Sequence, residues 1–286
     1  MQSLFFNLIG AGRLGKNLAL SLVSSGQISL RAILNKKFSS AEQTQSLVNQ
    51  GKPLISIMDL PSADITFITT PDDDIALIAL ELAQKKIVRP GSTVVHCSGV
   101  LSSEVLKPLQ EQGCYIASFH PLKAFRADVV DQNCFKNCDC AIEGDEQAIV
   151  ILSTLFKPLG ANLVTVDASK KILYHAAAVL AANHLVTLAA QAIELFVAAG
   201  IAEQEAKPII TRLMQTSLTN IQCAPSLTAA LTGPLVRGDI NTIAKHINAQ
   251  KNLPTLSLYK LLSLKTLPLT NLSLTQKNLL INMLTE

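Results

Sequence analysis

The sequence predicts an α/β domain built on a doubly wound, mostly parallel sheet, followed by an all-α domain. Three observations support this fold class: short apolar runs alternate with helical segments, a glycine-rich loop joins the first run to the first helix, and strand signals stop after Asp167. Most of the runs are apolar at consecutive positions, which is typical of strands covered by helices on both faces. We therefore expect two domains, comprising residues 1–166 and 167–286.

The expected strands follow one another in βαβ order along the first domain. They are Leu4 to Ile9, Leu30 to Leu34, Leu54 to Ile57, Ile65 to Thr69, Thr93 to Cys97, Tyr115 to Phe119, Cys138 to Glu143 and Asn162 to Val166. A helix near residues 145–157 separates the last two. The second domain should begin with one helix of about 30 residues, from Ser169 to Ala199, followed by shorter helices broken at glycine and proline.

The composition excludes several classes of protein. The chain has 286 residues, of which 49% are hydrophobic and 16% charged, so it can bury a sizeable core. Its net charge of +3 does not indicate a nucleic-acid partner. The first residues lack a basic segment, and their apolar run is too short for a signal peptide. We therefore expect no export and a cytoplasmic location.

The stretch "YHAAAVLAANHLVTLAAQAIELFVAAG" is apolar enough to raise the question of a membrane span. It also carries His175, Asn183 and Glu194, which would be costly to place against hydrocarbon. We therefore expect a buried helix of a soluble protein, with no membrane partner.

The six cysteines indicate reduced thiols rather than a disulfide framework, because no secretion signal accompanies them. Cys134, Cys138 and Cys140 raise the possibility of a metal site, but they contain no CxxC pair and have no histidine nearby. Cys138 and Cys140 alternate as two same-face positions of a strand would. Core thiols are therefore the favoured interpretation, and no metal is expected.

The opening segment "LFFNLIGAGRLGKNLALSLVSSG" places three glycines between an expected strand and an expected helix. In such a loop Gly10 makes the tight exit from the strand, Gly12 lets a pyrophosphate approach the backbone, and Gly15 lets the helix pack on the strand. Free N–H groups at the start of the helix attract the anion. The flanking elements favour a dinucleotide site in a Rossmann-type domain over a ligand-free turn. The expected contacts are Gly10, Ala11, Gly12, Arg13, Leu14 and Gly15.

The end of the second strand predicts which dinucleotide binds. NAD-binding loops carry Asp or Glu about 20 residues past the third glycine, where the carboxylate binds the ribose 2′-hydroxyl. Here that position is Asn35, followed by Lys36 and Lys37. Two ammonium groups attract a 2′-phosphate, whereas a carboxylate would repel it. NADP is therefore favoured over NAD, although two lysines are also typical of an ordinary solvated loop.

Further candidates follow the ends of the other strands, because ligands of open α/β sheets bind there. Thr70 and Pro71 would border the cofactor. One of the three aspartates at positions 72–74 is expected to cap the next helix rather than to bind a metal. Ser98 would hydrogen-bond the nicotinamide or the substrate, although a plain turn would have the same sequence.

His120 directly follows the strand residue Phe119 and is the best-placed titratable group in the sequence. An imidazole can give or take the proton that accompanies hydride transfer to or from a carbonyl or an imine. A histidine hydrogen-bonded to backbone at a strand end is an equally open interpretation.

The segment "DASKKILYHAAAVLAANHL" places Lys171, Tyr174 and His175 on one helix face at positions i, i+3 and i+4. Asn183 lies on roughly the same face twelve residues after Lys171. These polar groups would line a domain cleft, with Lys171 as a second candidate proton donor and the other three in contact with substrate. Hydrogen bonding inside a helical core remains the alternative. Arg237 is a candidate for holding a substrate carboxylate.

The segments "IGAGRLGKNLA", "TTPDDDI", "HCSG", "FHPLKAF", "KKILYHAAAVLAAN" and "LTGPLVRGD" carry a family resemblance over nearly the whole chain. In this order they resemble Rossmann-like predicted oxidoreductases whose C-terminal helical domain is a domain of unknown function. Those proteins are similar to pyrroline-5-carboxylate reductases, prephenate dehydrogenases and the 6-phosphogluconate and 3-hydroxyisobutyrate dehydrogenase group. The resemblance implies a nicotinamide cofactor, an active site in a cleft between domains, and dimerisation through the helices.

Two functions of different classes follow. The first is an NADP-dependent oxidoreductase that transfers hydride between the cofactor and a small carbonyl, imine or hydroxy-acid compound. The second is a dinucleotide-binding sensor or interaction protein without turnover. The glycine loop supports both, and the polar groups near the expected nicotinamide site favour the enzyme.

Overall fold

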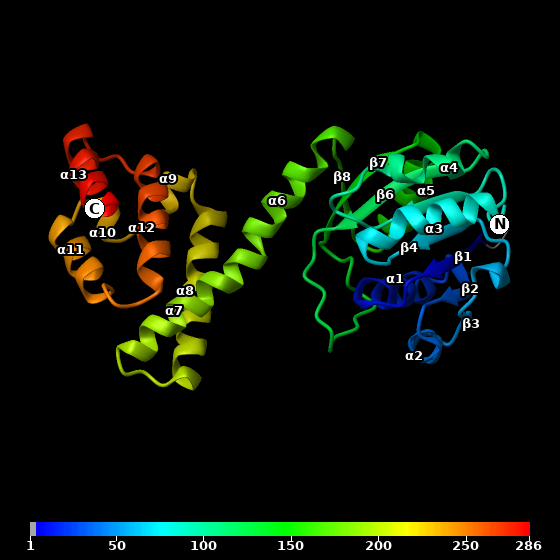
Figure 1. Ribbon diagram of the computed structural model, residues 1–286, viewed down its shortest axis with the longest axis horizontal. Coiled ribbons are helices and arrows are strands. Elements are labelled where there is room, and N and C mark those ends of the chain that lie inside the picture. The colour runs from blue at the N-terminus through cyan, green and yellow to red at the C-terminus, as the bar shows by residue number, and fades with distance from the viewer. Residues whose placement is uncertain (1–3) are drawn as a thin grey trace. The chain divides into compact units, whose positions relative to one another are not determined.

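A computed structural model describes residues 4–286 of the chain, which divides into two compact units between Ala182 and Asn183 (Figure 1). The first unit contains an eight-stranded sheet, and the second is entirely helical. Helix α6 (Lys171–Ala181) belongs to the first unit. This unit therefore extends past residue 166, where the sequence placed the end of the first domain.

The elements of the first unit alternate between strands and helices. In order they are β1 (Leu4–Ile9), α1 (Arg13–Ser24), β2 (Ile28–Leu34), α2 (Phe38–Val48), β3 (Lys52–Leu54), the 3-10 helix η1 (Ile57–Asp59), β4 (Ile65–Ile68), α3 (Asp72–Gln84), β5 (Thr93–His96), η2 (Ser103–Leu106), α4 (Lys107–Gln110), β6 (Tyr115–Pro121), β7 (Asp139–Gly144), α5 (Glu146–Phe156), β8 (Asn162–Thr165), η3 (Ala168–Lys170) and α6.

The sheet has the strand order β3-β2-β1-β4-β5-β6-β7-β8. Neighbouring strands are parallel except for the antiparallel pair β6 and β7. β1 lies between β2 and β4, so the chain order reverses at this point. In doubly wound sheets ligands bind outside the carboxyl ends of the strands at such a reversal. The predicted fold class, a doubly wound and mostly parallel sheet followed by helices, is confirmed.

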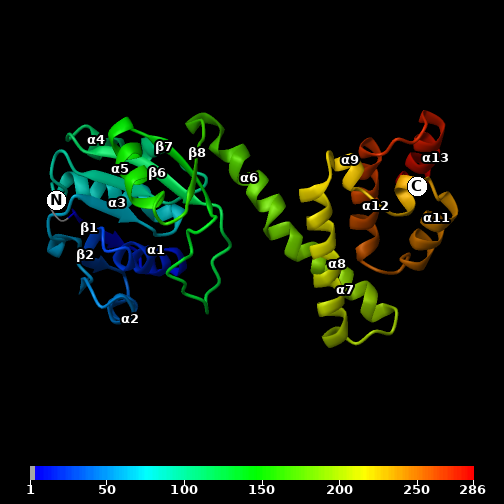
Figure 2. The ribbon, with the colours of Figure 1, turned by 180° about the vertical axis from the view of Figure 1, so that it is seen from behind.

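Helices cover both faces of the sheet, as the continuous apolar runs predict. Residues of α1, α2 and α5 pack with one face, around Leu18 and Phe156. Residues of α3 and α4 pack with the other, around Ile75 and Leu109. Accordingly, α3 lies in front of the sheet in Figure 1, and α5 lies in front in Figure 2.

Two local expectations were wrong. The third strand ends at Leu54 rather than at Ile57, because Ser56 accepts a hydrogen bond from the Met58 N–H and caps η1. None of the aspartates caps α3, whose N-cap residue is Pro71 without a side-chain cap hydrogen bond. Instead, all three lie in the first turn of α3. Carboxylates are favourable there because they interact with the helix dipole.

The second unit contains seven α-helices in the described chain. They are α7 (Asn183–Ala198), α8 (Glu203–Cys223), α9 (Leu227–Ala230), α10 (Pro234–Arg237), α11 (Ile240–Ala249), α12 (Thr255–Thr266) and α13 (Leu274–Thr285), with η4 (Leu267–Leu269) after α12. Its small apolar core includes Ile243, Leu267 and Leu280. The helix expected from Ser169 to Ala199 is thus two helices, α6 and α7, which meet at Ala182.

The expectation that this apolar segment is buried in the chain was wrong. Residues 168–198 are long and apolar enough to cross a membrane by length and composition, and the most apolar window has no buried residue. Ile172, Leu173, Leu180 and Val186 are between 65% and 73% exposed. These apolar side chains are therefore not covered by the unit to which each of them belongs.

Candidate functional site

The three glycines of the first loop have three different local environments. Gly10 has φ of 103°, which favours glycine, and a Cβ there would lie 2.8 Å from the carbonyl carbon of Thr69. A Cβ at Gly15 would lie 2.1 Å from the Gly10 oxygen. A Cβ at Gly12 would meet no atom within 4 Å. Gly10 and Gly15 therefore serve the packing of the loop, whereas the space at Gly12 is open to a ligand.

Side chains from both neighbouring strands hold the loop. Asn35, which follows β2, accepts a hydrogen bond from the Ala11 N–H at 3.0 Å. Thr69, which follows β4, donates its hydroxyl proton to the Gly10 oxygen at 2.6 Å. Asn35 also donates to the Lys37 oxygen at 3.2 Å. These bonds give Asn35 a structural role in shaping the loop.

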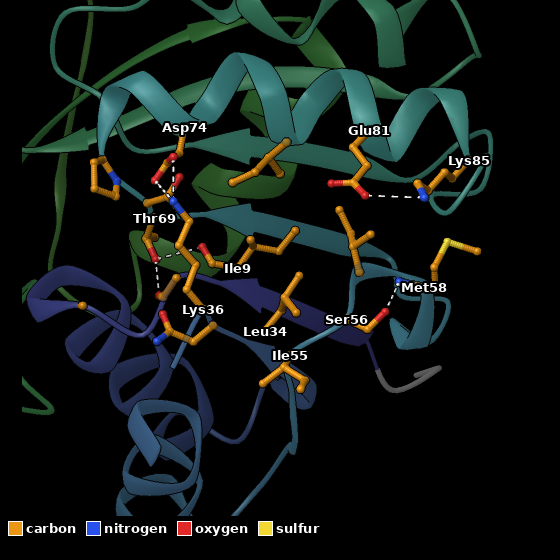
Figure 3. A pocket seen from close by; sticks show the side chains of 17 residues that line it. Ile9, Leu34, Lys36, Ile55, Ser56, Met58, Thr69, Asp74, Glu81 and Lys85 are labelled. Carbon is orange, nitrogen blue, oxygen red and sulfur yellow. Dashed lines mark hydrogen bonds and ion pairs between the residues drawn. The ribbon is translucent and has the colours of Figure 1, made fainter. Parts of the chain in front are cut away.

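A cavity of about 550 Å³ opens beside this loop (Figure 3). The polar end is formed by the glycine loop, Asn35, Lys36 and the segment 69–71, while Ile55, Met58 and Ile78 contribute apolar surface. The cavity extends to Glu81 on α3 and to Lys85, the C-cap residue that follows this helix, and the two form an ion pair with atoms 3.6 Å apart. Its volume lies within the range of sites that bind cofactors and other small molecules.

The lysines after β2 differ in their surroundings. The Lys36 ammonium contacts both carboxylate oxygens of Asp74, at 2.8 and 3.0 Å, and Figure 3 shows this pair at the cavity. The Lys36 side chain is 80% exposed and that of Asp74 is 25% exposed. Lys37 is exposed at the N-cap position of α2. The two predicted cations thus lie at the expected strand end, but one of them is paired.

Thr70 and Pro71 line the same cavity. Among the residues that the structure describes, the hydroxyl oxygen of Thr70 is one of three buried side-chain polar atoms without a hydrogen-bond partner. A buried hydroxyl without a hydrogen-bond partner is unfavourable unless a ligand or a water molecule supplies that hydrogen bond. Ser98, by contrast, is 4% exposed, and its hydroxyl accepts the N–H groups of Val100 and Leu101. Its side chain therefore shapes a turn.

A second group of polar side chains lies at the ends of β5 and β6. His120 Nδ1 is 2.8 Å from the hydroxyl of Tyr174, and the ring centres of His120 and His175 are 5.8 Å apart. A Cβ at Gly99 would lie 2.5 Å from a ring atom of His175 and 2.8 Å from one of His120. The glycine therefore leaves the space in which two imidazoles approach each other.

His120 is neutral at pH 7. Burial lowers its pKa to about 4, with further contributions from the charges of His175 and Lys171, while Asp72 acts in the opposite direction. Burial also raises the pKa of Tyr174. A neutral imidazole whose Nδ1 is paired with a hydroxyl can present its other ring nitrogen as a proton acceptor or as a hydrogen-bond donor, depending on the tautomer.

Lys171 lies in a buried polar cluster rather than at an open surface. The residue is 2% exposed, and its ammonium donates to the Ser98 oxygen at 3.1 Å, to the Ser118 hydroxyl, and to Glu143 at 3.4 Å. Glu143 also accepts the N–H and the hydroxyl of Ser103. Burial lowers the pKa of Lys171, which the Glu143 carboxylate opposes. This cluster fastens the start of α6 to β6 and β7.

Two further expected site residues, Asn183 and Arg237, lie in the second unit. Asn183 is exposed at the start of α7. Arg237 is exposed in α10 and forms an ion pair with Asp239 at 2.7 Å. In the first loop, Arg13 is exposed and Leu14 is half-buried at the start of α1. Among residues 4–286, no cluster of His, Cys, Asp or Glu is arranged to hold a metal ion.

Sequence reasoning missed several members of the site. Glu143 lies opposite Ser118 in the antiparallel pairing of β6 with β7, a register that cannot be read from either strand alone. Thr69 was assigned only to a strand, yet its hydroxyl holds Gly10. Ile55 and Met58, which are 66% and 57% exposed, were assigned to a strand or left unassigned. Their apolar character next to an edge strand was the available signal.

The comparisons with known proteins agree with this architecture. Residues 2–121 match the model of a Rossmann-like domain, and residues 138–266 match the model of a domain of unknown function, DUF2520. The two matches cover different segments of the chain, with the Rossmann-like match before the DUF2520 match. The predicted resemblance is thereby confirmed. A search of curated proteins gives no match.

Three solved structures with a similar fold illustrate the relationship. A candidate NADP oxidoreductase from Bacteroides fragilis is 22% identical, with a TM-score of 0.77 over 93% of this chain and 98% of that one. A protein from Thermotoga maritima is 25% identical, with a TM-score of 0.69 over 92% and 96%. A pyrroline carboxylate reductase from Plasmodium falciparum with NADP bound is 12% identical, with a TM-score of 0.60 over 99% of both chains.

Proposed function

We propose that the protein is an NADP-dependent oxidoreductase that transfers hydride between the cofactor and a small carbonyl, imine or hydroxy-acid compound. The observation that carries this proposal is the cavity at the reversal of strand order, which joins the glycine loop to a cationic strand end. The names of the Bacteroides and Plasmodium structures, both of which refer to NADP, support the same cofactor.

The residues of the cavity fit a dinucleotide. The open space at Gly12 and the free N–H groups at the start of α1 would hold the pyrophosphate. The apolar side chains of Ile55, Met58 and Ile78 would pack against the adenine, and Lys36 and Lys37 would bind a 2′-phosphate. The unpaired hydroxyl of Thr70 would find a partner on the ligand. Bound in this way, the cofactor would supply or accept a hydride.

We assign to His120 the transfer of the proton that accompanies hydride transfer. Its imidazole is half-buried beside Tyr174 and His175, and it is positioned by a hydrogen bond to Tyr174. Lys171 is the less suitable of the two expected candidates, because its ammonium is buried and already has three partners. We assign Lys171 a positioning role, in which it fixes the helix that carries Tyr174 and His175.

A titration followed by a screen tests the proposal. The purified protein is titrated with NADPH and NADH by following cofactor fluorescence, and then incubated with a panel of carbonyl, imine and hydroxy-acid metabolites while NADPH absorbance is monitored. We expect tighter binding of NADPH and turnover of at least one compound class. Absence of binding by both cofactors would overturn the proposal. Binding without turnover across the panel would instead favour a dinucleotide-binding sensor.

A further inference from the structure

We propose that Asp74 limits the selectivity of the cavity for a 2′-phosphorylated dinucleotide by holding the ammonium of Lys36. This inference rests on the proposed function, because it concerns the same cofactor cavity. It assigns a role to a residue that sequence reasoning treated only as a possible helix cap.

The ion pair joins two elements on opposite sides of the glycine loop. Lys36 follows β2 and Asp74 lies in the first turn of α3, which follows β4, and β2 and β4 are the two neighbours of β1. Both carboxylate oxygens are within 3.0 Å of the Lys36 ammonium. Both residues line the cavity, as Figure 3 shows. The pair therefore spans the place where the sequence predicts recognition of the 2′-position.

The two partners differ in mobility, which decides what happens when a ligand arrives. The Asp74 side chain is three-quarters buried. It belongs to the first turn of α3, where the backbone N–H of Asp74 donates to the Pro71 oxygen. The Lys36 side chain is 80% exposed and can rotate. A 2′-phosphate must therefore draw Lys36 away from a stationary carboxylate and then remain near that negative charge.

Binding of NADH does not require Lys36 to leave Asp74, because NADH has a 2′-hydroxyl in place of the 2′-phosphate. This hydroxyl carries no charge, and a carboxylate accepts a hydrogen bond from such a hydroxyl in many NAD-binding sites. Asp74 therefore reduces the affinity for NADPH and leaves that for NADH nearly unchanged. A partly exposed ion pair contributes up to about 1 kcal/mol, so the effect on the NADPH dissociation constant should be about threefold to fivefold.

The other aspartates of the same turn provide an internal comparison. Asp72 acts on the pKa of His120 and of Lys171, so its charge is felt at the polar groups at the ends of β5 and β6. Asp73 is exposed, and no ion pair involves it within residues 4–286. Asp73→Asn therefore changes the net charge as Asp74→Asn does, in the same helical turn, without releasing Lys36.

The test is a fluorescence titration of NADPH and NADH with the full-length wild type and the variants Asp74→Asn, Asp73→Asn, Lys36→Ala and Lys36→Ala/Asp74→Asn. Asp74→Asn should bind NADPH about threefold to fivefold more tightly, with NADH affinity within about twofold of wild type. The gain should shrink at high ionic strength and in the Lys36→Ala background. Asp73→Asn should show a smaller gain.

Three results would overturn the inference: unchanged NADPH affinity in Asp74→Asn, equal gains for both cofactors, or an equal gain with and without Lys36. Each of these requires that the wild type binds a nicotinamide cofactor, so none contradicts the proposed function. If the wild type and all variants bind neither cofactor, the proposed function fails and this inference fails with it.

Discussion

At the scale of single residues, His120 is the group on which the proposed chemistry depends. His120→Asn should lower turnover by roughly 10²-fold or more, the usual scale of general acid–base catalysis, once a substrate is known. The affinity for NADPH should persist, because His120 does not line the cofactor cavity. Steady-state kinetics and cofactor titration measure the two effects.

The second unit offers a matched control for this variant. His246 Nδ1 is 2.8 Å from the hydroxyl of Tyr259, the same kind of pair that His120 forms with Tyr174. His246→Asn should leave turnover unchanged. Equal losses in the two variants, or wild-type turnover in His120→Asn, would contradict the assignment.

The pH dependence of turnover follows from the state of His120. Its pKa of about 4 makes it neutral at pH 7, so it is ready to accept the proton released when a hydroxyl substrate is oxidised. In that direction, kcat/KM should stay constant as the pH falls from 7 and should decline only near pH 4, where the imidazole becomes protonated. A pH profile in the oxidation direction measures this. A decline centred at the ordinary histidine pKa would show that the buried environment does not control the group.

Lys171 and Glu143 form a buried ion pair whose role is tested through stability. Lys171→Met leaves the Glu143 carboxylate uncompensated and should lower the free energy of unfolding by roughly 3–5 kcal/mol. Lys171→Met/Glu143→Gln should recover part of that loss, because neither charge then remains. The adjacent Lys170 forms only an exposed pair with Asp167, so Lys170→Met should change stability by about 1 kcal/mol or less.

Urea unfolding and turnover per folded molecule separate the two roles of Lys171. Lost stability with retained turnover is the expected outcome for a positioning residue. Wild-type stability with lost turnover would instead identify Lys171 as the proton donor.

At the scale of elements, two glycines of the first loop have different roles: Gly12 leaves space for the cofactor, and Gly15 allows α1 to pack against the loop. Gly12→Ala should fold as the wild type does, because its Cβ meets no protein atom and its φ of −80° suits alanine, but it should bind NADPH more weakly. Gly15→Ala should lower the melting temperature, because its Cβ would overlap the Gly10 oxygen. Thermal unfolding with and without NADPH measures both effects. Equal stability of the two variants, or wild-type NADPH affinity in Gly12→Ala, would refute the division.

Elements that carry their own signal could be predicted from the sequence. The apolar runs placed the strands within a few residues, and glycine spacing placed the loop that begins α1, because both depend on local patterns. The third strand was extended too far, since apolar residues at an edge continue into a turn that lines the cavity. The polar cluster around Lys171 and Glu143 depends on the register between strands that are distant in the sequence. Such contacts leave no local pattern in the sequence.

At the scale of the whole molecule, the exposed apolar side chains of residues 168–198 predict an interaction surface. Leu173 and Leu180 of α6 are 73% and 65% exposed, and their spacing of seven residues places them on one helix face. Exposed apolar patches of this kind mark interaction surfaces in soluble proteins. The alanines along α6 and α7 allow a second helix to approach closely. We therefore propose a homodimer in which this segment meets a second copy of the chain.

The oligomeric state tests this last prediction. Light scattering should give twice the chain mass at micromolar concentration, and Leu173→Glu/Leu180→Glu should shift the protein toward monomer, because two carboxylates would be buried without partners in the interface. Leu77 on α3 is 67% exposed but lies outside the segment, so Leu77→Glu should leave the dimer intact. A wild-type monomer, or a protein that leaves the membrane fraction only with detergent, would refute the prediction. The second result would favour a membrane span, against which His175 and Glu194 argue because each is costly in hydrocarbon.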